Sequence, residues 1–202
     1  MIGIIDYGVG NLFSLKSSLE YVGLKSIVSN NKDELIKADR IILPGVGAFR
    51  DAFDKLNKAN MIKFLNEIKD ENMPLMGICL GMQLLFERSY EYGTHGGLGY
   101  LKGEVIDMKK DIDSDLKIPH MGWNKLSLVK SNPLLKYTSD GEFVYFVHSY
   151  MADNCEDSLV AYSEYGCKVP AMVSKNNIYG CQFHPEKSGE TGLNILKAFN
   201  EV

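Results

Sequence analysis

Residues 76–83 read MGICLGMQ and place one cysteine, Cys79, two positions from a glycine on either side. An apolar run at residues 74–78 leads into Cys79, and a run typical of a helix, residues 82–88, follows it. This is the pattern of a nucleophile elbow, a sharp strand-to-helix turn, with cysteine in place of serine. Such a turn exposes the sulfur, sets it near a helix N-terminus that favours a thiolate, and aims backbone N–H groups at a developing oxyanion. The pattern therefore predicts an α/β fold with Cys79 at its chemical centre.

Strand and helix patterns alternate along the chain before this elbow. Strands are expected at residues 2–5, 25–29, 40–43 and 74–78, and helices at 12–22, 32–37, 48–57 and 61–70. Asn11 can cap the first helix, and Gly23 can end it. The β-α-β-α order predicts an open, mostly parallel sheet with helices on both faces.

The second half of the chain has a different character. Short strands with turns between them are expected at residues 98–108, 125–129, 143–147, 159–162, 171–175 and 178–183, and a helix at 188–200. These strands predict antiparallel additions to the sheet. The polar, glycine-rich loop at residues 89–97 is expected to be mobile and to close over a site. A length of 202 residues without a linker or repeat favours one domain, residues 1–202.

Composition excludes several classes of function. The net charge of −4 argues against binding to nucleic acid or to an anionic membrane surface. No apolar stretch approaches the roughly 18 residues of a membrane span, and the N-terminus lacks a basic signal region. The four cysteines form no C-x-x-C pair, so a zinc or redox site is not expected, and free thiols in a reducing cytoplasm are the default. We therefore expect a cytoplasmic protein in which Cys155, Cys167 and Cys181 are structural.

A second chemical signal lies at residues 180–188, which read GCQFHPEKS. Glu186 follows His184 by two positions, so an extended backbone would place both side chains on one face. The carboxylate can hold one imidazole nitrogen while the other takes a thiol proton and returns it to a leaving amine. An isolated histidine at a strand end is most often a surface residue. Together with the cysteine elbow, this pair instead predicts a Cys79–His184–Glu186 triad.

A third signal is the glycine turn at residues 43–49, LPGVGAF, between a predicted strand and a predicted helix. Its N–H groups could stabilise an oxyanion, although an ordinary βα turn is the favoured explanation when the pattern is considered alone. The turn is not a P-loop, because no Lys-Ser/Thr follows the glycines. Residues 8–10 are not a dinucleotide fingerprint either, since Phe13 replaces the third glycine.

These three segments carry a family resemblance. The elbow at residues 77–83 and the HPE motif at 184–186 resemble those of class I (triad) glutamine amidotransferases, which have a flavodoxin-like fold. The segments PGVGAF at 44–49, PHMGWN at 119–124 and YFVHSY at 145–150 are similar to those of the glutaminase subunits of imidazole glycerol phosphate synthase, the two-component enzyme of histidine biosynthesis. The resemblance covers essentially the whole chain.

The resemblance implies a role for each matching residue. Cys79 would attack the side-chain amide of L-glutamine, form a γ-glutamyl thioester and release ammonia. His184 would be the general base and then the acid, and Glu186 would orient it. The N–H of Leu80 and one from Gly45, Val46 or Gly47, in the glycine turn, would hold the oxyanion. Gln83 and Glu91 match positions that hold the amino-acid end of glutamine.

The resemblance also implies a partner. A (β/α)₈-barrel cyclase subunit would dock over the site and take ammonia through its interior, and it would bind the phosphorylated substrate. Met121, Trp123, Tyr145 and Lys187 would lie at the interface or gate. For the two aromatic residues the alternative is core packing, and for Lys187 a solvated charge. His120 and His148 are expected to be structural, and no metal or organic cofactor is implied.

Several alternatives remain open at the level of sequence. A paralogous glutaminase could supply ammonia for amidation of a surface sugar, with the same chemistry and a different partner. A cysteine peptidase or chaperone-like relative is disfavoured by Glu186 and by the glycine turn. A non-enzymatic binding module is disfavoured by the intact triad.

Overall fold

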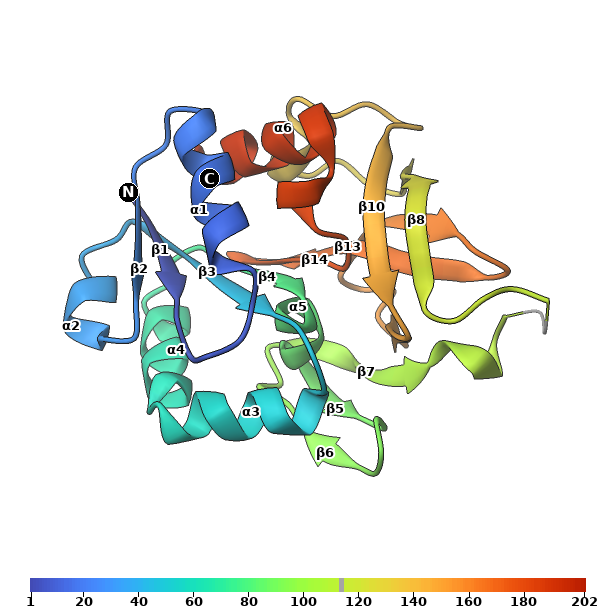
Figure 1. Ribbon diagram of the computed structural model, residues 1–202, viewed down its shortest axis with the longest axis horizontal. Coiled ribbons are helices and arrows are strands. Elements are labelled where there is room, and N and C mark those ends of the chain that lie inside the picture. Colours follow the sequence, from blue (N-terminus) through green and yellow to red (C-terminus); the bar gives the residue numbers. More distant parts are fainter. Residues whose placement is uncertain (113–114) are drawn as a thin grey trace.

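The main sheet of the computed structural model has eight strands within residues 1–112 and 115–202, the residues that the structure describes. Figure 1 shows this sheet twisting through the centre of the molecule. The parallel strands, in spatial order, are β2 (Ser26–Ser29), β1 (Ile2–Ile5), β3 (Arg40–Gly45), β4 (Leu75–Cys79) and β14 (Ile178–Cys181). The antiparallel additions are β13 (Lys168–Lys175), β12 (Leu159–Glu164) and β9 (Ser127–Leu128). The predicted open, mostly parallel sheet with antiparallel additions is confirmed.

Helices cover both faces of the parallel strands. One face carries α1 (Leu12–Tyr21) and α6 (Gly189–Phe199), and the other carries α3 (Phe49–Lys58), α4 (Met61–Asp70) and α5 (Leu80–Leu84), while α2 (Lys32–Leu35) is a short turn between β2 and β3. Side chains along β3 alternate between the two layers: Ile42 packs with α1 and α6, whereas Leu43 packs with α3 and α4. Strands β1, β4 and β14 are buried on both faces, which explains why they read as continuous apolar runs.

Two smaller β structures flank the main sheet. A four-stranded sheet has the order β11 (Tyr150–Asp153), β7 (Leu101–Asp107), β5 (Phe86–Ser89) and β6 (His95–Gly96). An antiparallel ribbon pairs β8 (His120–Lys125) with β10 (Phe143–His148), with Trp123 opposite Tyr145. Single 3₁₀ turns occupy η1 (Met108–Lys110), η2 (Pro133–Leu135) and η3 (Pro185–Lys187). We call β8 and β10 the ribbon from here on.

The helix after the elbow is shorter than the sequence predicts. Residues 82–88 were expected to be helical, but α5 ends at Leu84 and Phe86 begins β5. The carbonyls that a longer helix would use are bonded elsewhere, because Leu98 N–H donates to Leu84 O and Tyr100 N–H donates to Leu85 O. Tertiary pairing with the returning chain therefore overrides the local helical pattern.

Other local predictions also need correction. Strands β8 and β11 were not predicted, and Asn11 precedes α1 without making a side-chain cap bond. Gly23 follows α1 with φ +77°, as its role as a helix terminator requires. The loop expected at residues 89–97 contains β6 and is tied to α3, since Glu91 accepts a hydrogen bond from Phe49 N–H.

Two glycines allow α5 to lie directly against the strands. A Cβ added to Gly81 would meet Leu43 O at 1.9 Å, and one added to Gly77 would meet Gly81 O at 2.5 Å. Both distances are well inside van der Waals contact, and the neighbouring atoms are backbone that cannot rotate away. The spacing of glycines around Cys79 is therefore a packing requirement as well as a turn signal.

This packing predicts a large difference between two Gly→Ala substitutions. Gly81→Ala should lower the free energy of unfolding by about 2–3 kcal/mol, because the new methyl overpacks the α5–β3 contact. Gly96→Ala is the matched control, since a Cβ there meets nothing within 4 Å. It should change stability by less than about 0.5 kcal/mol. Urea unfolding of the two variants measures both values, and equal stabilities would contradict the packing argument.

Candidate active site

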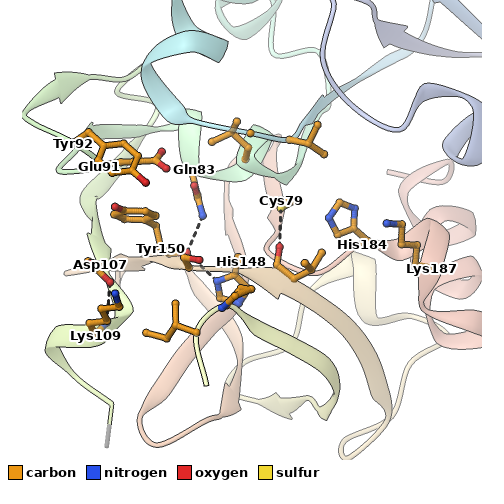
Figure 2. Close-up of a pocket in the computed structure, with 17 residues that line it drawn as sticks. Cys79, Gln83, Glu91, Tyr92, Asp107, Lys109, His148, Tyr150, His184 and Lys187 are labelled. Carbon is orange, nitrogen blue, oxygen red and sulfur yellow. Dashed lines mark hydrogen bonds between the residues drawn. The ribbon is translucent and has the colours of Figure 1, made fainter. Parts of the chain in front are cut away.

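Cys79 sits on a strained backbone between β4 and α5. Its φ of 55° and ψ of −113° lie outside the regions that non-glycine residues ordinarily adopt, at a cost of about 1–3 kcal/mol. The side chain is largely buried but opens into a cavity, as Figure 2 shows. Strain of this kind persists only where the surrounding structure enforces it, and it concentrates at functional sites. The predicted nucleophile elbow is present in the fold.

His184 and Glu186 form a buried pair next to Cys79. The His184 Nδ1 and Glu186 Oε1 atoms are 2.8 Å apart, and the two side chains are only 4% and 3% exposed. Glu186 belongs to the 3₁₀ turn η3, so the pair meets across a tight turn rather than along an extended strand as the sequence predicted. The structure thus brings the three predicted triad residues together.

The electrostatics of His184 follow from these two neighbours. Burial alone lowers its pKa, but hydrogen bonds to Cys79 and Glu186, together with their negative charges, outweigh burial and raise the pKa to about 9. Because Nδ1–H is donated to Glu186, the other ring nitrogen is the one that bonds to the Cys79 sulfur. A protonated imidazole at neutral pH then stabilises a thiolate beside it.

A cavity of about 630 Å³ opens in front of the sulfur. Its walls come from the glycine turn, the elbow, the loop after β5, the β7–η1 junction and the ends of the ribbon. They include Val46, Gly47, Cys79, Leu80, Gln83, Glu91, Tyr92, Asp107, Lys109, Ile118, Pro119, His184, Lys187 and residues 147–150. The volume admits a small polar metabolite with its reacting group at Cys79.

Gln83 and Glu91 form a polar wall of this cavity (Figure 2). Glu91 Oε2 accepts a 2.6 Å hydrogen bond from Phe49 N–H at the start of α3. Burial raises the pKa of Glu91, and that hydrogen bond opposes the rise. Gln83 donates from Nε2 to Tyr150 O at 2.9 Å and to Gln182 Oε1 at 3.0 Å. A carboxylate that faces the cavity suits a ligand with an ammonium group.

The glycine turn borders the sulfur from the other side. Val46 is 40% exposed, and both Val46 and Gly47 line the cavity with Leu80. Gly47 has φ +91°, which a side chain would disfavour. Tyr7 donates its hydroxyl to Pro44 O at 2.8 Å, and burial raises the pKa of Tyr7, so this donor stays protonated. The turn is therefore held firmly just before the residues that reach the cavity.

The predicted interface residues gather at the ribbon beside the cavity. Met121 and Trp123 are 60% and 52% exposed, so neither belongs to the core. The Trp123 and Tyr145 rings meet edge to face with centroids 6.0 Å apart, and Lys187 Nζ lies 6.0 Å from the centre of the Tyr145 ring. Exposed apolar side chains grouped in this way are typical of interaction surfaces.

Sequence reasoning assigned no role to two polar residues here. Gln182 is fully buried with Nε2 3.8 Å from Cys79 Sγ, and Tyr150 offers its carbonyl to Gln83. Gln182 stands two positions before His184, a period-two spacing that could have indicated a shared face. His120 and His148 are buried with ring nitrogens 3.1 Å apart, and burial lowers the pKa of both, to about 3 for His148.

The described residues, 1–112 and 115–202, bear on metal binding and on membrane insertion. No group of three or more His, Cys, Asp or Glu side chains among them is arranged to hold a metal ion. No helix in this part of the chain is both long and apolar enough to cross a membrane.

Comparisons with known proteins agree with this geometry. The family profile "Glutamine amidotransferase class-I" matches residues 3–201. The "Imidazole glycerol phosphate synthase subunit HisH" of Bacillus velezensis is 52% identical over 205 residues, which cover 100% of this chain and 96% of that protein. The protein of the same name from Lactococcus lactis is 52% identical over 201 residues, covering 99% and 98%.

Solved structures show the same fold at low identity. The "Crystal structure of glutamine amidotransferase" has a TM-score of 0.76 at 17% identity, with 98% of each chain covered. The "Structure of PurLQS from Thermotoga maritima" has a TM-score of 0.75 at 19% identity, covering 99% of this chain and 97% of that one. At these identities the likeness concerns the fold alone.

The environment of His184 predicts an unusual titration. Its imidazole should stay protonated at pH 7.5 and lose its proton near pH 9, which NMR of histidine-labelled protein can follow. Glu186→Gln should bring the midpoint toward the ordinary value of about 6.5, because one of the groups that hold the proton is removed.

The same shift has a consequence for stability. Since the folded pKa lies above the ordinary one, protonated His184 adds stability that is fully present below about pH 6.5. That contribution is lost as the pH rises through about 9. A wild-type midpoint at or below 6.5 would contradict the ion-pair description of the site.

Proposed function

The chain belongs to the class-I glutamine amidotransferase family, and we propose that it is the glutaminase subunit of imidazole glycerol phosphate synthase in histidine biosynthesis. It hydrolyses L-glutamine to glutamate and ammonia, and the ammonia is consumed by a partner subunit. The observation that carries this proposal is the buried His184–Glu186 pair beside the strained Cys79 at the cavity wall.

Within this proposal, Cys79 is the nucleophile. Its thiolate attacks the side-chain carbonyl carbon of glutamine and forms a tetrahedral oxyanion. Leu80 N–H and an N–H of the glycine turn, from Gly45, Val46 or Gly47, stabilise that oxyanion. His184 gives its proton to the leaving nitrogen, so ammonia departs and a γ-glutamyl thioester remains. His184 then takes a proton from water, which attacks the thioester and releases glutamate and the thiolate.

Glu186 has the supporting role in this cycle. It accepts Nδ1–H of His184 and thereby fixes the tautomer that leaves the other nitrogen facing the sulfur. Its negative charge also stabilises the imidazolium. Both functions require the Glu186 carboxylate to be shielded from water and close to the imidazole. The Glu186 side chain is 3% exposed, and its Oε1 lies 2.8 Å from His184 Nδ1.

Gln83 and Glu91 hold the amino-acid end of glutamine. Glu91 lies across the cavity from His184, with Gln83 between them (Figure 2). The Glu91 carboxylate complements the α-ammonium group of the substrate by charge. Its anchor to the first turn of α3 fixes the distance between this group and the sulfur.

The ribbon is the proposed site of contact with the partner. Ammonia released into water would be protonated at neutral pH and would lose its nucleophilicity, so it needs a dry path to its acceptor. We assign this role to a (β/α)₈-barrel cyclase subunit that covers Met121, Trp123, Tyr145 and Lys187, with the gate beside Tyr145 and Lys187. The exposure of Met121 and Trp123 supports this assignment. The glutaminase occupies residues 1–202 as one domain and acts in the cytoplasm.

The division of labour between the subunits gives the first functional prediction. Cys79→Ala should reduce glutamine-dependent synthesis by the complex at least about a thousandfold, because no other group can form the thioester. Synthesis from added ammonium salt should persist, since the partner alone carries that step. Product formation with each nitrogen source measures both rates. Loss of the ammonia-dependent rate in a complex that still assembles would contradict the proposal.

The proposed interface gives the second functional prediction. The isolated chain should hydrolyse glutamine slowly, and saturation with the cyclase and its nucleotide ligand should raise the rate about tenfold or more. Trp123→Ala should weaken binding to the cyclase about tenfold or more, as expected for a half-exposed aromatic anchor.

Tyr21→Ala is the matched control for Trp123→Ala. Tyr21 is an exposed aromatic residue at the C-terminal end of α1, outside the ribbon. Calorimetric titration and a coupled glutamate assay provide the two readouts. Equal turnover with and without the cyclase would defeat the proposed coupling, and equal affinities of the two variants would place the interface elsewhere.

A further inference from the structure

Gln182 is a polar side chain near the sulfur that the proposed cycle leaves unused. It is fully buried on the segment that joins β14 to His184, and its Nε2 lies 3.8 Å from Cys79 Sγ. A buried primary amide is costly unless both its ends are bonded, so its orientation has a definite cause. That cause is a series of hydrogen bonds that leads away from the sulfur.

The orientation of the Gln182 amide is set by its neighbour Gln83. The main-chain carbonyl of Tyr150 can only accept, so Gln83 must present its NH₂ group there. The second hydrogen of the same NH₂ group points to Gln182 Oε1, 3.0 Å away. With its oxygen committed to Gln83, Gln182 must turn its own NH₂ group toward Cys79.

The Tyr150 carbonyl is in turn fixed from the far side. His148 Nδ1 lies 2.9 Å from this oxygen, which makes Nδ1 the protonated nitrogen of that ring. Figure 2 shows the bonds from Gln83 and His148 converging at Tyr150. Behind His148 stands His120, which stacks on Phe146 and Tyr165 and contacts Asn124 on β8. The carbonyl therefore cannot turn away without breaking a buried network.

We propose that Gln182 is a catalytic residue that stabilises the Cys79 thiolate by donating an N–H to its sulfur, with its amide oriented by the chain Gln83–Tyr150 C=O–His148. This role rests on the proposed function, in which Cys79 is the nucleophile. A hydrogen bond to the charged form favours that form, and the effect is strong where water is excluded. His184 supplies the positive charge beside the sulfur, and Gln182 supplies a second, neutral donor.

The other groups around the sulfur do not replace this donor. The Val147 carbonyl lies 4.0 Å from Sγ and can accept from a thiol but cannot stabilise a thiolate. The Tyr7 hydroxyl is already given to Pro44 O. Among the described residues with contacts to the sulfur, His184 and Gln182 are thus the donors that side chains provide.

The test is the pH dependence of Cys79 alkylation by iodoacetamide, read at the Cys79 peptide by mass spectrometry. Gln182→Met keeps the length of the side chain and removes the donor. The alkylation midpoint should move to higher pH, so that the rate at a pH below the wild-type midpoint falls about tenfold. The plateau rate at high pH should not fall, because the freed thiolate is at least as nucleophilic.

Two further measurements keep the test decisive. Ser163→Ala, which removes another buried hydrogen bond, to Lys125 O, should leave the alkylation curve unchanged. In the wild-type protein, the side-chain NH₂ signals of Gln182 should shift with the same midpoint as alkylation. That NMR measurement needs no variant, so it decides the matter even if Gln182→Met does not fold.

The outcomes separate this inference from the proposed function. If Cys79 in the wild-type chain reacts no faster than Cys155 or Cys181, the proposed nucleophile itself is wrong. If Cys79 is selectively reactive but the Gln182→Met curve superimposes on the wild-type curve, Gln182 is a structural residue and only this inference fails. Gln182 NH₂ signals that do not respond to titration or alkylation would overturn it as well.

Discussion

The backbone bend at Cys79 is the constraint on which the rest of the structure depends. A φ of 55° with ψ of −113° is unfavourable for any residue with a side chain, and nothing in Cys79 itself compensates for it. The compensation comes from the burial of β4 and α5 on all sides, and from two glycines that let the helix touch the strands. Relaxing the bend would separate α5 from β3 and open the core. The fold thus holds the sulfur in a position that local conformational preference would not select.

Burial also determines how the charges around the sulfur are arranged. Three ionisable side chains, Cys79, His184 and Glu186, are almost completely removed from water. Their charges can be accommodated only as an alternating series in which the imidazolium stands between the thiolate and the carboxylate. Glu186 Oε2 has no hydrogen-bond partner among the described residues, so its carboxylate depends heavily on the imidazolium. The site is therefore ordered by electrostatics as much as by packing.

Much of this arrangement could be predicted from the sequence. The parallel strands, the elbow and the HPE motif each leave a local pattern in the sequence. The strands are apolar because both of their faces are buried, the elbow is flanked by glycines at fixed spacing, and the histidine and glutamate of the motif are two positions apart. The features that were missed depend on distant residues. The end of α5 is set by Leu98 and Tyr100, and Gly122, with φ +143°, interrupts the alternation that would have revealed β8. The role inferred for Gln182 depends on the direction of a carbonyl 32 residues away in the chain, at Tyr150, which no local pattern encodes.

Two hydrogen bonds join β10 of the ribbon to the turn that follows His184, and a third closes that turn on itself. His184 N–H donates to Tyr145 O at 3.0 Å, Tyr145 N–H donates to Ser188 Oγ at 2.9 Å, and the Ser188 hydroxyl donates to His184 O at 2.7 Å. Strand β10, the proposed contact with a partner, and the turn that presents His184 are consequently one rigid unit. A displacement of the β10 backbone at Tyr145 is therefore transmitted directly to the backbone of His184.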